Sequence, residues 1–149
     1  NSIEAYSSRG SIVTPTVSVQ DDLLFGYTHY GYDGTQYVQS SFIAAGVDSQ
    51  ATVGAGAVPG NITLATTPDN GVNNNFVVLN KDGNFGVNTI TPTEKLDVAG
   101  NVKTSGFVQF GSLTTVQRDA LTAVNGMVIY NSNDNKFQGY ENGAWTNLI

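Results

Sequence analysis

The sequence predicts a mainly β protein built from short strands and turns, with one or two short helices. Its 149 residues include 17 glycines, no cysteine and 12% charged residues, about half the charge density of a typical soluble domain. Valine, threonine and asparagine are abundant, which favours strands and turns over long helices. The apolar runs are short and broken by Gly and Asn, and few segments carry a sustained apolar face. We therefore expect partner chains to complete the core.

Residues 1–75 are expected to form a β-rich N-terminal module. Strands over residues 24–30 and 35–42 flank a Tyr-Asp-Gly turn at residues 32–34. The later expected elements are a tight bend of small residues over 54–60, a strand at 62–64, a turn at 69–71 and a surface loop at 72–75.

Residues 76–112 are expected to form a neck segment. The apolar run 76–79 is followed by Asp82-Gly83, a pair typical of tight hairpin turns, after which Phe85 and Val87 resume a strand. In residues 91–94 a capping hydroxyl, a proline and a glutamate predict about one helical turn.

A further brief strand is expected where Leu96 and Val98 alternate with polar or small residues, and Gly100-Asn101 ends it. Residues 107–110 are expected to extend from there towards the C-terminal region.

Residues 113–149 are expected to form a helix followed by a β-meander, as a terminal tip or trimerisation module. Thr114 and Gln117 form a predicted capping box for a helix that runs to about Ala123. Strands are expected over residues 127–130, 136–140 and 145–148. Asn142-Gly143, between the last two strands, is the strongest short-range hairpin signal in the chain.

Two segments carry a resemblance to a known family. KDGNFGVNTITPTEKLDVAGNV, residues 81–102, resembles a motif in the fibres of tailed bacteriophages and related injection-system appendages. The matching residues are Asp82-Gly83, Phe85-Gly86-Val87, Pro92, Lys95-Leu96-Asp97-Val98 and Gly100-Asn101-Val102. Residues 113–148 are similar to a module at the ends of such fibres, and the first half of the chain more loosely resembles the β-rich segment that often precedes the motif.

The resemblance implies an elongated, intertwined homotrimer in a virion tail or surface appendage, assembled in the host cytoplasm and acting outside the cell. One departure is Asn88, where the family usually has glycine. Asparagine accepts left-handed backbone geometry better than most residues, so we expect the fold to tolerate it.

Charge and hydropathy limit the other partners. A net charge of −6 with six scattered basic residues argues against nucleic-acid binding, which needs Lys and Arg to displace counterions from phosphates. No apolar run approaches the roughly 20 residues of a membrane span, and the first residues lack the features of a secretion signal. The expected partners are further copies of the chain, other tail or fibre proteins, and a host glycan or protein receptor.

We expect no enzymatic activity, no cofactor and no metal site. The single histidine, His29, is interpreted as an imidazole packed among Phe25, Tyr27 and Tyr30. Asn131, Asn133 and Asn135 imitate the start of a calcium loop, but Lys136 stands where glycine is required. Asp21-Asp22 is the only adjacent acidic pair, and neighbours on a strand point to opposite faces, which does not suit the paired carboxylates of a glycosidase.

Aromatic side chains are the remaining candidates for binding, because Tyr and Trp stack on sugar rings while their polar edges form hydrogen bonds. The candidate receptor contacts are Tyr30, Tyr32, Tyr37, Tyr140 and Trp145. The structural alternative is that these residues fill a trimer core, especially those of the meander. The expected function is a trimeric fibre protein that attaches to a host. The alternatives are a purely structural connector or decoration protein and, less favoured, a capsule-degrading enzyme or a cell-surface adhesin.

Overall fold

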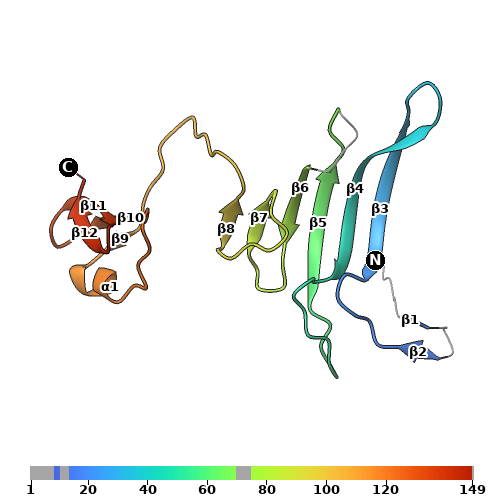
Figure 1. Ribbon diagram of the computed structural model, residues 1–149, viewed down its shortest axis with the longest axis horizontal. Coiled ribbons are helices and arrows are strands. Elements are labelled where there is room, and N and C mark those ends of the chain that lie inside the picture. The colour runs from blue at the N-terminus through green and yellow to red at the C-terminus, as the bar shows by residue number, and fades with distance from the viewer. Residues whose placement is uncertain (1–8, 11–13, 70–74, 149) are drawn as a thin grey trace, which may run out of the picture. The chain divides into compact units, whose positions relative to one another are not determined.

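The computed structural model describes residues 9–10, 14–69 and 75–148 (Figure 1). It confirms a mainly β chain, with one five-residue helix among the described residues. Contacts divide the chain into two compact units, Asn1–Val102 and Lys103–Ile149. This differs from the three expected regions, because strands on both sides of residue 75 pair in one sheet.

A six-stranded sheet with strands in sequence order dominates the first unit (Figure 1). Its strands are β3 (Leu23–Tyr32), β4 (Tyr37–Val47), β5 (Gly60–Thr66), β6 (Asn75–Leu79), β7 (Phe85–Val87) and β8 (Leu96–Val98). Neighbours from β3 to β7 are antiparallel, whereas β7 and β8 are parallel. A separate ribbon pairs β1 (Arg9–Gly10) with β2 (Pro15–Thr16). Residues 70–74, which include part of an expected turn and loop, lie outside the described residues, and Asn75 begins a strand instead of ending that loop.

The predicted turn between β3 and β4 is held by the Asp33 carboxylate. Its Oδ1 accepts hydrogen bonds from the Thr35 hydroxyl at 2.7 Å and from the backbone N–H groups of Thr35 and Gln36 at 2.7 and 2.9 Å. These donors, the Thr35 hydroxyl foremost, lower the pKa of Asp33. Gly34 follows with φ +104°, a conformation that residues other than glycine rarely adopt.

Asn80 organises the predicted hairpin turn between β6 and β7. This side chain is 5% exposed, and its Oδ1 accepts hydrogen bonds from the backbone N–H groups of Asp82 and Asn84 at 3.0 and 2.9 Å. Of the predicted Asp-Gly pair, only Gly83 takes a positive φ, +70°. The turn is therefore a three-residue loop with its left-handed residue at the last position.

Residues 91–94 do not form the predicted helical turn. The backbone N–H of Thr93 donates to Asp97 Oδ2 at 3.2 Å, and the carbonyl of Pro92 accepts from the Asn84 side chain at 3.1 Å. A contact with the preceding hairpin and a short-range bond to a side chain therefore replace the helical backbone bonds. The strand at 85–87 and the strand at 96–98 were both predicted, but not their parallel pairing.

The second unit contains the predicted helix and meander. Helix α1 (Thr115–Asp119) begins with the predicted capping box of Thr114 and Gln117, but it ends before the expected Ala123. The antiparallel meander is β10 (Val128–Asn131), β11 (Lys136–Glu141) and β12 (Ala144–Asn147), so Met127 lies outside the strand expected to contain it. Strand β9 (Ser112–Leu113) adds a parallel edge to β10 that the sequence did not predict.

Little of the chain is buried. The buried apolar side chains among the described residues are Val47, Ala51, Ala65, Val78 and Ile129. Large apolar side chains are exposed along the sheet instead, among them Ile62 at 51%, Leu64 at 47% and Leu96 at 60%. A single copy therefore leaves much apolar surface open to solvent, as the sequence predicted.

Candidate interaction surfaces

One face of the six-stranded sheet is lined with apolar side chains; we call it the apolar face. Residues that pair directly across neighbouring strands point to the same side, so the register defines its rows. The first row is Phe25, Ala45, Ile62, Leu79, Phe85 and Leu96. The second row is Tyr27, Ile43, Leu64, Val77, Val87 and Val98.

The apolar face is uncovered, whereas the opposite face is partly covered. Ile43, Ile62 and Leu64 on the apolar face are 46%, 51% and 47% exposed. On the opposite face, Ala65 and Val78 are only 5% and 2% exposed. The sheet is thus a single layer in which the side with more large apolar residues faces solvent.

Segment 88–95 covers part of the opposite face at Gly86. A Cβ atom added at Gly86 would lie 2.4 Å from the carbonyl oxygen of Thr89 and 3.4 Å from the Pro92 Cβ, so only glycine fits there. Asn88 begins this segment with φ +55°, and its Oδ1 accepts from the backbone N–H of Phe76 at 3.1 Å. The left-handed asparagine expected at this position is confirmed.

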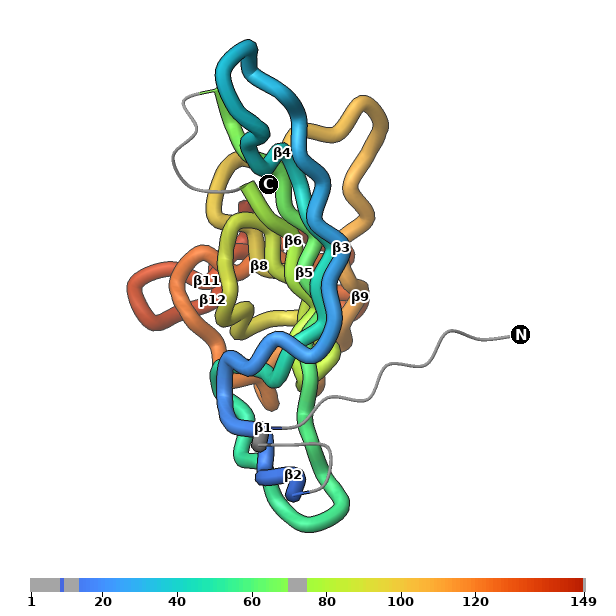
Figure 2. Tube along the Cα trace, turned by 90° about the vertical axis from the view of Figure 1, so that its right-hand side faces the viewer, coloured from blue at the N-terminus to red at the C-terminus, as the bar shows by residue number. Residues whose placement is uncertain are grey.

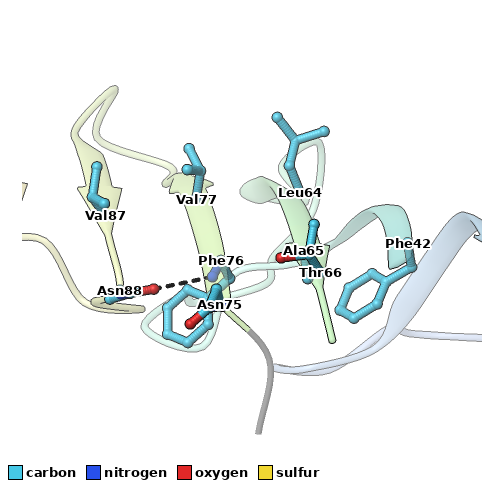
Figure 3. A pocket seen from close by; sticks show the side chains of 9 residues that line it. All are labelled: Phe42, Leu64, Ala65, Thr66, Asn75, Phe76, Val77, Val87 and Asn88. Atoms are coloured by element: carbon cyan, nitrogen blue, oxygen red, sulfur yellow. Dashed lines mark hydrogen bonds between the residues drawn. The ribbon is translucent and has the colours of Figure 1, made fainter. Parts of the chain in front are cut away.

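A hollow of about 430 Å³ lies at the strand ends near Asn88. Figure 3 shows Leu64, Val77 and Val87 pointing to one side of the sheet and the Phe76 ring pointing to the other. This view agrees with the faces derived from the register. The hollow is lined mainly by apolar atoms and by no ionisable side chain.

A third row across the same side of the sheet is polar. It consists of His29, Ser41, Thr66 and Asn75. His29 is exposed, and its Nδ1 lies 3.1 Å from Ser41 Oγ. The interpretation of a packed histidine is therefore wrong for the single chain, and Tyr30, as its neighbour on the strand, points to the other face.

The candidate tyrosines of the first unit lie at the turn end of strands β3 and β4. Figures 1 and 2 show the hairpin that these two strands form. Tyr30, Tyr32 and Tyr37 are 61%, 62% and 74% exposed, and the rings of Tyr32 and Tyr37 are 5.4 Å apart. Strand alternation places Tyr30 and Tyr32 on the face opposite Tyr27, and Tyr37 pairs with Tyr32. A β-bulge at Ser40 shifts the β4 register here, which turns Tyr37 to that same side.

The candidate aromatics of the second unit form a different arrangement. Tyr140 and Trp145 are direct cross-strand partners, with ring centroids 5.2 Å apart in an edge-to-face geometry. Both are half-buried within the single chain. The Asn142-Gly143 turn beside them has φ values of +51° and +80°, so the predicted hairpin is confirmed.

A buried polar network stabilises the second unit. Asn131 is 0% exposed, and its Nδ2 lies 3.1 Å from oxygens of Thr115, Asp134 and Gln138. Its Oδ1 accepts from the backbone N–H of Asn133 at 2.9 Å. The asparagines that resemble a calcium loop therefore form a side-chain-closed turn, since Asn131 uses its donors and acceptors within the chain.

The acidic pair Asp21-Asp22 lies in a turn before β3 and not on a strand, so the geometry assumed for it was wrong. Asp21 has φ +64°, and Asp22 accepts hydrogen bonds from Arg9 Nη2 at 2.7 Å and from the backbone N–H of Val19 at 2.9 Å. The Arg9 guanidinium, followed by the Val19 amide, lowers the pKa of Asp22.

Across residues 9–10, 14–69 and 75–148, no group of three or more His, Cys, Asp or Glu side chains is placed to hold a metal ion. In the same part of the chain, no helix has the length and apolar character needed to cross a membrane.

Residues 86–149 match a family described as the phage tail like trimerisation region. This match supports a structural, tail-type protein that self-associates into trimers. It begins at Gly86, so it includes the last two residues of β7, all of β8 and the whole second unit. No curated protein matches the chain.

Sequence reasoning missed the apolar face. Few sustained apolar segments are visible in the sequence, because each strand contributes only two residues to the two apolar rows. The available signal was alternation, as in Ile62 and Leu64 with Asn61 and Thr63 between them. That signal marks one face of each strand but not which strands lie side by side.

Proposed function

We propose that this protein is a trimeric segment of a virion tail fibre or similar appendage and that it attaches to a host surface without covalent chemistry. The observation that carries the attachment is the tyrosine group Tyr30, Tyr32 and Tyr37. These three side chains are largely exposed at a hairpin end, on the side of the sheet opposite the apolar face. A surface of this kind suits sugars or protein loops, because tyrosine rings stack while their hydroxyls form hydrogen bonds.

Trimerisation would multiply weak contacts. Three tyrosine groups on one fibre, and several fibres on one particle, raise the overall affinity by avidity without any new contact. The extracellular partner would be a host glycan or a surface protein, and the structural partners would be other tail proteins.

The test is binding of the isolated protein to candidate host cells and to their purified envelope glycans. A Tyr32→Ala/Tyr37→Ala variant is expected to lose most of the binding, while retaining the wild-type native mass. Val58→Ala is the matched control, because Val58 is 52% exposed near the opposite end of the sheet. If the wild-type protein binds and the tyrosine variant binds equally well, the assignment of the tyrosine group as the receptor contact is contradicted.

The alternative is a structural connector without a receptor site. It is favoured by the extent of apolar surface that the chain offers to its own copies. Failure of the wild-type trimer to bind any plausible host, together with capture of another tail protein, would support this alternative. A capsule-degrading activity would instead release reducing ends from host polysaccharide.

A further inference from the structure

The apolar face has the composition of an interior, not of a solvated surface. Its two apolar rows contain no charged side chain. Leu96, which ends the first row on strand β8, is 60% exposed. Contiguous exposed apolar areas of this kind mark interaction sites, because burial removes them from water. The described residues of the first unit supply no second layer to cover them.

The apolar face is broad enough for an extensive interface. Its two apolar rows join two residues from each of six strands, and Tyr27, Ile62 and Leu96 among them are 54%, 51% and 60% exposed. A stable interface buries about 800 Å² on each partner, so contacts with two neighbours in a trimer need about 1,600 Å². Segment 103–111, where Phe107 is 87% exposed, offers further apolar surface.

The apolar face is continuous with the family-matched region. Val87, Leu96 and Val98 lie within residues 86–149 and also complete the two apolar rows. The rows then continue through β6, β5, β4 and β3, none of which the family match includes. A trimer contact that begins on β7 and β8 would therefore extend across the sheet without a break.

We propose that the apolar face is buried against two further copies of this chain, so that β3 to β6 form part of the trimer interior. The copies are parallel, because the polar row that contains His29 and Thr66 then meets the same row of its neighbours, and apolar rows meet apolar rows. This inference rests on the trimeric assembly of the proposed function but not on host attachment.

Single-cysteine labelling tests the burial directly, since the natural sequence contains no cysteine. Leu64→Cys places a thiol on the apolar face, and Thr28→Cys places one on the other face of the same sheet. In the native protein, a maleimide should react with the Leu64→Cys thiol at least about tenfold more slowly than with the Thr28→Cys thiol, because thiol reactivity follows exposure. In denaturant the two rates should become equal.

Native mass, measured by light scattering over a dilution series, provides the second test. Leu64→Asp is expected to shift the mass from three chains towards one, whereas the matched control Thr28→Asp keeps three. Leu64→Asp with an undiminished trimer would overturn the inference. If Leu64→Asp fails to fold, the thiol rates decide, because Leu64→Cys is the milder change.

The two proposals fail in different ways. A wild-type protein that is a single chain at all concentrations contradicts the trimeric assembly and, with it, the buried face. A wild-type trimer in which the Leu64→Cys and Thr28→Cys thiols react equally fast leaves the assembly intact and overturns only the inference.

Discussion

Replacing Gly86 with alanine tests the close packing of segment 88–95 on the six-stranded sheet. The added Cβ would lie 2.4 Å from the Thr89 carbonyl oxygen and 3.1 Å from the Thr89 Cγ2. The first distance is about 1 Å shorter than ordinary van der Waals contact. Because the nearest atom belongs to the backbone, the clash cannot be relieved by a side-chain rotation, and the whole segment must shift.

The expected cost is about 1–3 kcal/mol per chain, as for overpacking in other well-packed sites. For a chain of this size that corresponds to a fall in melting temperature of about 3–10 °C. The matched control is Gly54→Ala, since no atom lies within 4 Å of the Cβ position at Gly54 and its φ is not positive. This control should melt close to wild type.

Thermal unfolding followed by circular dichroism at a fixed chain concentration is the appropriate assay, because the stability of an oligomer depends on concentration. Native mass should be measured for each variant at the same concentration. If Gly86→Ala and Gly54→Ala both melt within about 1 °C of wild type, a difference far below the expected cost, then the close approach of Thr89 to Gly86 is refuted.

Substitutions at two further positions, Asn88 and Asp22, test single side chains. Asn88→Gly should lower the free energy of unfolding by about 1 kcal/mol, because the hydrogen bond to the Phe76 amide is lost. Asn88→Ala should lower it by about 1 kcal/mol more, because alanine disfavours the positive φ at this position. Equal urea midpoints for the two variants would contradict this expectation. Because Arg9 lowers the folded-state pKa of Asp22, this carboxylate stabilises the fold above its unfolded pKa of about 3.9, and the benefit is lost as pH falls through the lower folded pKa. The wild-type protein should therefore have a higher melting temperature than Asp22→Asn near pH 6, and the two melting temperatures should converge in acid. A difference in melting temperature that stays constant down to about pH 3 would count against the ion pair.

Turns and caps were predicted most accurately, because their determinants lie within a few residues. Asn142-Gly143 adopts the two positive φ angles that a two-residue hairpin requires, and Thr114 and Gln117 form the predicted capping box. Asn88 likewise takes the left-handed conformation that its side chain tolerates. Each of these features depends on local backbone chemistry.

The failures came where distant residues compete with local preferences. Residues 91–94 have a helical start signal, yet the side chains of Asn80 and Asn84 in the preceding hairpin turn donate to the carbonyl of Pro92. The Asp22 carboxylate, expected on a strand, lies in a turn and binds Arg9. Tertiary hydrogen bonds outweigh a local signal worth about 1 kcal/mol.

The candidate site divides in the same way. The sequence identified the aromatic residues, and it supplied the alternation that gives each strand an apolar side. It could not show that Tyr30 and Tyr32 face away from the apolar rows while Tyr27 belongs to them, because this depends on how the strands pair around the bulge at Ser40.

The sequence by itself determined the short strands and most of the turns between them, because backbone propensity and composition are local properties. Only the tertiary structure decided that β7 pairs with β8 in parallel and that two residues from each of six strands share one open apolar face. The physical reason is register, since a shift of one residue in a strand moves its apolar side chains to the other side of the sheet.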